Sequence, residues 1–110
     1  MQKIKISTAQ FENRSGDKKY NLEVIDRLTG DAARHGSQAI AFHECSVTGY
    51  TFARKLSKEA LLDLAETIPE GESIQQLKEI AARHDMLVMA GFFEKDQDDK
   101  PYKTYVFVGK

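Results

Sequence analysis

The chain has 110 residues, of which 41% are hydrophobic and 30% are charged, as is typical of one compact soluble domain. Its 16 basic and 17 acidic side chains give a formal net charge of -1, which gives no electrostatic reason to expect a nucleic-acid or membrane partner. A single cysteine excludes an internal disulfide and paired-cysteine metal sites, which favours a reducing, cytoplasmic location. No stretch reaches the ~20 apolar residues of a membrane span, and the N-terminus lacks the apolar run of a signal peptide.

The first 43 residues predict a strand, a helix and a second strand. Apolar and polar residues alternate at the start of 3–11, which indicates a strand with one more buried face. Asp17 is a candidate N-cap for a helix that ends at Gly36. Residues 38–43 form a short apolar run, typical of a strand covered on both faces of a parallel sheet. The apolar positions of the helix are Leu22, Val24, Ile25, Leu28, Ala32 and Ala33.

The middle of the chain predicts a loop and two further helices. Residues 44–57 mix glycine, threonine, serine and aromatic residues without periodicity, which indicates a loop at the carboxyl end of the second strand. A short helix is expected at about 57–66, and proline and glycine then interrupt the chain at 69–71. Ser73 is a candidate N-cap for a second long helix over 73–84.

The last 25 residues predict a β-hairpin. Residues 86–93 are apolar without interruption and too short for a buried helix, so we expect a central third strand. A charged turn over 94–100 leads to a fourth strand at 102–108. The pattern is therefore alternating α/β. It contains no phosphate-cradling or dinucleotide-binding glycine motif, so we expect no nucleotide cofactor.

Two long helices are too few to cover both faces of a four-stranded sheet. We expect apolar side chains of the strands at 86–93 and 102–108 to remain exposed, and such patches drive association. Either another chain or further segments of a longer protein would complete the core. The sequence thus predicts at least a dimer, a homo-oligomer joined through the sheet face or through the edge of the last strand.

Several short motifs share one family pattern. Glu44 follows the second predicted strand and precedes the turn Thr48-Gly49-Tyr50. Ala-Gln-Phe at 9–11, Asn-Leu at 21–22 and Gly-Phe-Phe-Glu at 91–94 support the same pattern. The chain resembles the carbon–nitrogen hydrolase family, also called the nitrilase superfamily, from residue 3 to about 108. The resemblance implies an αββα sandwich, of which residues 1–110 would be a single, incomplete N-terminal portion.

The resemblance also implies a chemistry. Family members hydrolyse non-peptide amides, carbamoyl compounds or nitriles through a cysteine thioester-type intermediate, with a glutamate as general base and a lysine that stabilises the tetrahedral intermediate. Glu44 matches the general base. The family's lysine and nucleophilic cysteine would both fall after Lys110, so we expect the 110-residue chain alone to be inactive. No metal or organic cofactor is implied, and the expected partner is a small-molecule amide or nitrile.

Other side chains near Glu44 have alternative interpretations. Tyr50 and Phe52 are candidates to line a substrate pocket or to pack against the sheet, and Glu94 is a candidate for the pocket or for a structural hydrogen bond. Cys45 is expected to be a buried, inert thiol, because neighbouring residues of an extended chain point to opposite sides. Lys103 stands where the family commonly has asparagine. Both Lys103 and Lys110 precede the position of the family's lysine, so neither is assigned its role.

A second functional class remains open. The missing nucleophile would also fit a non-catalytic α/β interaction module, or a truncated product, that self-associates through its sheet. A small flavodoxin-like binding domain fits the alternating pattern as well, but it has no phosphate loop to support it.

Overall fold

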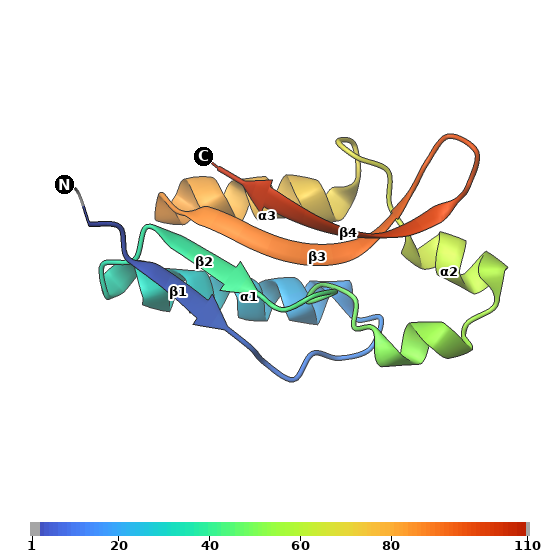
Figure 1. Ribbon diagram of the computed structural model, residues 1–110, viewed down its shortest axis with the longest axis horizontal. Helices are drawn as coiled ribbons and strands as arrows, with labels where there is room; N and C mark the ends of the chain where they lie inside the picture. Colours follow the sequence, from blue (N-terminus) through green and yellow to red (C-terminus); the bar gives the residue numbers. More distant parts are fainter. Residues whose placement is uncertain (1–2, 110) are drawn as a thin grey trace.

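The computed structural model describes residues 3–109, and within them four strands form one mixed sheet (Figure 1). The strands lie in chain order, β1-β2-β3-β4. The first two pairs are parallel and the hairpin pair, β3 with β4, is antiparallel. The predicted central position of the third strand is therefore confirmed. The strands are β1 (Ile6–Ala9), β2 (Ala39–Phe42), β3 (Leu87–Lys95) and β4 (Pro101–Val108).

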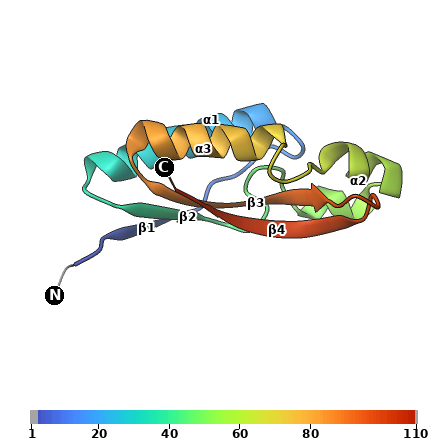
Figure 2. The same cartoon turned by 90° about the horizontal axis from the view of Figure 1, so that it is seen from above.

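Two long helices, α1 (Lys18–Arg34) and α3 (Glu72–His84), cover the same face of the sheet (Figure 2). Among the described residues no helix covers the other face of β2, although Ala39 on that face is buried between its neighbouring strands. Parallel strands joined through a helix make right-handed crossovers, and the order β1-β2-β3 advances in one direction, so both connecting helices lie on one side. No helix within residues 3–109 is long and apolar enough to cross a membrane.

The ends of several elements differ from the sequence-based boundaries, whereas one predicted helix cap is confirmed. The first strand covers Ile6–Ala9 instead of 3–11, because β2 offers only four pairing partners. The predicted loop contains a short 3₁₀ helix, η1 (Thr51–Lys55), before the helix α2 (Lys58–Leu64). The N-cap of α1 is confirmed, since the Asp17 carboxylate accepts a hydrogen bond from the Tyr20 backbone.

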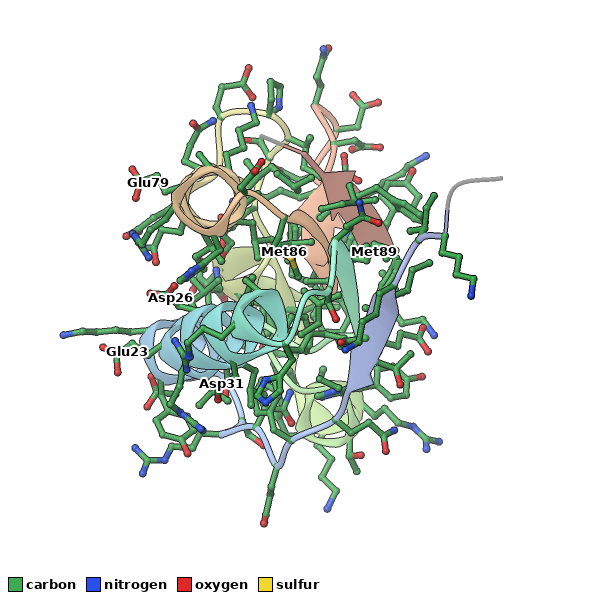
Figure 3. All side chains as sticks on the ribbon, turned by 90° about the vertical axis from the view of Figure 1, so that its left-hand side faces the viewer. Glu23, Asp26, Asp31, Glu79, Met86 and Met89 are labelled. Carbon is green, nitrogen blue, oxygen red and sulfur yellow. The ribbon has the colours of Figure 1, made fainter. Side chains whose placement is uncertain are left out.

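The core lies between the helices and one face of the sheet. Leu22 and Ile25 of α1 and Leu77 of α3 are buried against this face, which β3 supplies in part through Val88 and Phe92. Met86 lies between the two layers, whereas Glu79 points away from the sheet (Figure 3). The helical spacing of apolar residues in the sequence therefore identified the buried faces of both long helices.

The opposite face of the sheet carries exposed apolar side chains. Ile6 is 58% exposed and Phe107 is 68% exposed, and Leu87 and Tyr105 are exposed beside them. By strand register Ile6, Ala39 and Leu87 form one row, and Met89 pairs with Phe107 in the next. The expected uncovered apolar sheet surface is therefore present, and we call it the open sheet face.

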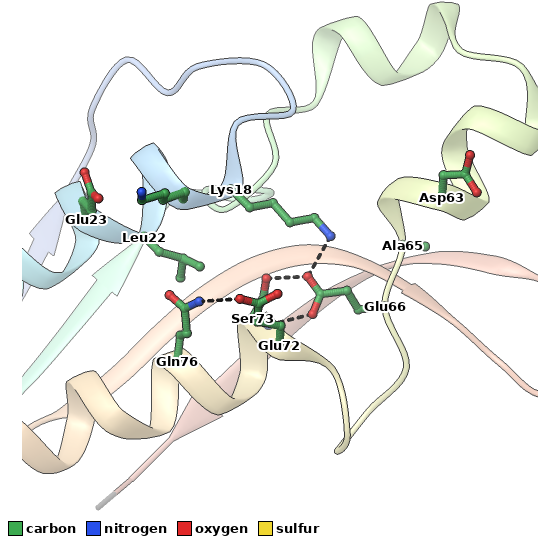
Figure 4. Close-up of a pocket in the computed structure, with 10 residues that line it drawn as sticks. Lys18, Leu22, Glu23, Asp63, Ala65, Glu66, Glu72, Ser73 and Gln76 are labelled. Atoms are coloured by element: carbon green, nitrogen blue, oxygen red, sulfur yellow. Dashed lines mark hydrogen bonds and ion pairs between the residues drawn. The ribbon is translucent and has the colours of Figure 1, made fainter.

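The start of α3 is capped by a carboxylate from a preceding segment (Figure 4). Ser73 is not the N-cap; it lies in the first turn of α3, and Gly71 occupies the N-cap position. The Glu66 carboxylate accepts hydrogen bonds from the Ser73 backbone N–H at 2.6 Å, from the Ser73 hydroxyl and from Lys18 Nζ at 2.7 Å. One side chain thus joins α1 to α3 and satisfies a free N–H of the helix end.

The charge of Glu66 is favoured in the folded chain. Burial alone would raise the pKa of this carboxyl, but the hydrogen bonds from Lys18 and Ser73 outweigh burial and hold the pKa below its usual range. A carboxylate whose pKa is lowered by folding stabilises the fold above its unfolded value, near 4.5.

We predict that Glu66→Gln lowers the free energy of unfolding at pH 7 by about 1–3 kcal/mol, because it weakens charge-assisted hydrogen bonds to partly buried donors. The difference from the unchanged chain should shrink as the pH falls through the folded-state pKa of Glu66, since protonation removes the same charge. Urea denaturation at neutral and acidic pH measures both. Glu70→Gln, at an exposed carboxylate nearby, serves as the control, and a pH-independent difference for Glu66→Gln would contradict the assignment.

Candidate functional site

Glu44 lies in the loop that leaves the carboxyl end of β2. Its side chain is 65% exposed, whereas the five residues that follow it are buried. The chain reverses tightly here: the backbone N–H groups of Thr48 and Gly49 donate to the Cys45 carbonyl at 3.2 and 2.7 Å. Cys45 adopts a left-handed backbone with φ of 55°, which is uncommon outside glycine and asparagine. The Glu44 side chain therefore points into solvent, while the turn formed by the next five residues is buried.

Two asparagine side chains hold this loop. The Asn21 amide of α1 is fully buried and donates to the Val47 carbonyl at 2.8 Å. Asn21 also binds the backbone of Arg14 through both its oxygen and its nitrogen. The Asn13 amide donates to the carbonyls of Cys45 and Ser46, both at 3.1 Å. Asn21 is one of the residues on which the family resemblance rests, and these contacts give its physical role.

The same loop is in close contact with β3. The Val47 N–H donates to the Gly91 carbonyl at 3.0 Å, and the Gly91 N–H donates to the Ser46 hydroxyl. A Cβ atom added at Gly91 would lie 2.6 Å from the Cys45 backbone nitrogen, closer than real contacts allow. Glycine is therefore required at this position for the loop to cross β3.

Glu44 forms an ion pair with Lys103 of β4. Lys103 Nζ lies 2.9 Å from Glu44 Oε1 and 4.6 Å from the centre of the Tyr50 ring. The hydrogen bond to Glu44 raises the pKa of Lys103, which keeps the ammonium group charged at neutral pH. Both side chains are more than one third exposed, so the pair adds little to stability and mainly sets where the carboxylate points.

Cys45 does not have the properties of a nucleophile. Its side chain is buried, as expected, and burial together with the charge of Glu44 raises the pKa of the thiol to about 11. At neutral pH the group is therefore protonated, whereas the reactive form of cysteine is the thiolate.

The structure brings only one of the three pocket candidates next to the Glu44–Lys103 pair. Tyr50 stacks beside Lys103. Phe52 is half-buried and packs near Gly16 and Gly49 on the other side of the turn. Glu94 accepts a hydrogen bond from the Thr104 hydroxyl at 2.8 Å, which is the structural alternative weighed for it. Because Phe93 pairs with Lys103, the next residue, Glu94, faces the opposite side of β3.

A hollow of about 260 Å³ lies beside this pair, between η1 and the β3–β4 hairpin. We call it the Arg54–Lys103 hollow after its two charged residues. Its remaining lining residues are aromatic, apolar or proline: Tyr50, Ala53, Leu61, Phe93, Pro101 and Tyr102.

A larger hollow, of about 520 Å³, lies between α1, the end of α2 and the start of α3, where Glu66 is already bound by three donors (Figure 4). Glu44 lines neither hollow, and it reaches the smaller one only through its contact with Lys103. Within residues 3–109 no three histidine, cysteine or acidic side chains are placed to hold a metal ion. Lys110 lies outside the described residues.

Sequence reasoning missed Arg54 entirely and did not predict that Lys103 would contact Glu44. The signal that could have found the Glu44–Lys103 contact is the register of the β3–β4 hairpin. The charged turn fixes which residue of β4 lies opposite Phe93, and that residue is Lys103. Arg54 had no such signal, because it lies in a 3₁₀ helix within a segment without periodicity.

Comparison with known proteins gives consistent matches. A nitrilase from Pyrococcus abyssi is 29% identical over 106 residues, which cover 96% of this chain and 39% of that protein. An amidase from Nesterenkonia sp. superposes with a TM-score of 0.72 at 19% identity, over 94% of this chain and 37% of the amidase. A carbon–nitrogen hydrolase superfamily protein from Xanthomonas campestris, solved with an arsenic adduct in its active site, superposes with a TM-score of 0.79 at 20% identity. That match covers 99% of this chain and 37% of the other.

The chain therefore spans about two fifths of the length of the proteins it matches. The structural likenesses establish the α/β fold of the nitrilase superfamily. The sequence pattern of the family itself, described as carbon-nitrogen hydrolase, matches residues 5–110. On this match over nearly its whole length, the chain belongs to the carbon–nitrogen hydrolase family.

Proposed function

We propose that the protein hydrolyses a small non-peptide amide, carbamoyl compound or nitrile, and that Glu44 is its general base. The observation that carries the proposal is the placement of Glu44. It is an exposed carboxylate on a loop fixed by Asn13, Asn21 and Gly91, at the carboxyl end of a parallel strand, where open α/β sheets bind their ligands. Family membership supports the same assignment.

In the proposed reaction Glu44 accepts the proton of a cysteine thiol. The thiolate then attacks the carbon of the amide, and a lysine ammonium stabilises the negative charge of the tetrahedral intermediate. Protonated Glu44 returns its proton to the amide nitrogen, which leaves as ammonia or an amine, and water hydrolyses the thioester to the acid and the free thiol. A nitrile would instead form a thioimidate, which one water converts to the same thioester with release of ammonia. This chemistry requires neither a metal nor an organic cofactor. We place the protein in the cytoplasm, where the thiol of the proposed nucleophile would stay reduced.

The cysteine and the lysine of this reaction are not assigned within the chain. Cys45 is buried and its thiol is protonated at neutral pH. Lys103 contacts Glu44, but it precedes the position of the family's lysine, so we keep it outside the catalytic set. Glu44 would thus be this chain's contribution to a site completed by later segments.

We predict that the purified 110-residue chain releases no ammonia from amides or nitriles, because the nucleophile is absent. In the whole protein Glu44→Gln should lower kcat by at least about 100-fold, the usual loss when a general base is removed. Ammonia release measures both. Glu12→Gln, at another exposed carboxylate, is the matched control and should leave turnover unchanged. Turnover by the 110-residue chain that Glu44→Gln abolishes would contradict the proposal.

We predict that Cys45→Ser in the whole protein keeps most of the activity, because the thiol is buried and the small hydroxyl fits the same space. The same ammonia assay, with circular dichroism to verify the fold, measures the effect. Complete loss of turnover in a correctly folded variant would make Cys45 the nucleophile and refute its assignment as an inert thiol.

A second candidate function is supported by the open sheet face. A non-catalytic module that self-associates would bury Ile6, Leu87 and Phe107, which are exposed in the isolated chain. Burying a few hundred Å² of apolar surface at about 25 cal/mol per Å² would yield a free energy comparable with the stability of a small domain.

We predict that the 110-residue chain is at least a dimer in solution, since water contact with the open sheet face is unfavourable. Sedimentation equilibrium at micromolar concentration measures the mass. Phe107→Lys should shift the equilibrium toward monomer, whereas Lys78→Glu, on the outer side of α3, should not. A stable monomer with sharp cooperative unfolding would rule out self-association.

A further inference from the structure

Two positively charged side chains that take no part in the proposed reaction line the Arg54–Lys103 hollow. Arg54 and Lys103 are its charged lining residues, and no acidic residue lines it. Arg54 is exposed, and its side chain makes no ion pair or hydrogen bond with the residues that the structure describes. A guanidinium group presents five N–H donors in a fixed, planar arrangement that matches a carboxylate.

The carboxylates near the hollow leave Arg54 without an ionic partner. Glu44 pairs with Lys103, and Asp96 accepts a hydrogen bond from the Tyr102 hydroxyl at 3.0 Å, but neither carboxylate lines the hollow or contacts Arg54. Lys103 has three N–H donors, and among the residues that the structure describes Glu44 is its one ionic partner. Donors therefore remain for an anion on both sides of the hollow.

The apolar walls of the hollow strengthen its attraction for an anion. Phe93 is buried, and Leu61, Ala53 and Pro101 add apolar surface. Apolar walls next to like charges focus the electric field toward the opening. The volume of about 260 Å³ is below the range of complete ligand sites, about 300–1,000 Å³, so the hollow suits one part of a substrate. Lys103 lines the hollow and contacts Glu44, so the hollow would hold the end of the substrate that is remote from the reacting carbon.

We propose that Arg54 and Lys103 form a carboxylate-binding subsite, so that the substrate is an amide or nitrile whose acyl chain carries a carboxylate. This inference rests on the proposed function. In this subsite Arg54 determines substrate specificity and takes no part in the bond-breaking steps. Lys103 both binds the carboxylate and positions Glu44, while the apolar walls contact the methylene groups between the two ends.

The test compares two amides of equal chain length with the whole protein: succinamate, which ends in a carboxylate, and butyramide, which ends in a methyl group. We expect kcat/KM to be higher for succinamate and the preference to fall with added salt. Arg54→Gln should lower kcat/KM for succinamate about tenfold, mainly through KM, and leave butyramide nearly unchanged. Arg54→Lys should restore part of the loss, and Lys55→Gln, in the same turn but outside the hollow, is the matched control.

The outcomes separate this subsite from the proposed function. Turnover of both amides with equal efficiency, or an equal effect of Arg54→Gln on both, overturns the subsite and leaves the hydrolase assignment intact. If the unchanged protein hydrolyses neither amide, the proposed function fails for this substrate class, and calorimetry then decides the subsite. Tighter binding of succinamate than of butyramide, lost in Arg54→Gln, supports the subsite; equal affinities overturn it.

Discussion

The contact between the Glu44 loop and β3 is the constraint on which the candidate site depends. The loop crosses β3 at Gly91, where no side chain larger than hydrogen fits beside the Cys45 backbone. The buried Asn21 amide ties the same loop to α1. Because a buried amide without partners is costly, this arrangement tolerates little displacement. An exposed carboxylate thereby obtains a fixed position from a buried and hydrogen-bonded support.

A second constraint fixes how the helices meet the sheet. The Glu66 carboxylate binds Lys18 of α1 and the first turn of α3. The backbone of Glu66 also bonds to Phe93 and Lys95, beyond the paired part of β2. One residue in an irregular segment therefore joins two helices and a strand.

The unequal covering of the sheet follows from its strand order. Successive right-handed crossovers in one direction place α1 and α3 on the same face and leave the other face apolar and exposed. The site lies at the carboxyl end of β2, near the hairpin, so Glu44, Lys103 and Arg54 remain accessible next to that face. The fold thus places three charged side chains next to the open sheet face, whose apolar residues favour association.

The sequence by itself determined the elements that depend on local chemistry. The spacing of apolar residues identified both long helices, Asp17 identified the start of α1, and the uninterrupted run at 86–93 identified the central strand, because these signals lie within a few residues of one another. The assignment of Glu44 as a candidate general base rests on a short motif and stays a prediction. Only the tertiary structure decided that Glu66 caps α3, that both helices share one face, that Lys103 contacts Glu44, and that Arg54 and Lys103 line one hollow. These contacts join residues far apart in the chain, and their geometry depends on strand register and crossover handedness, which a local pattern does not encode.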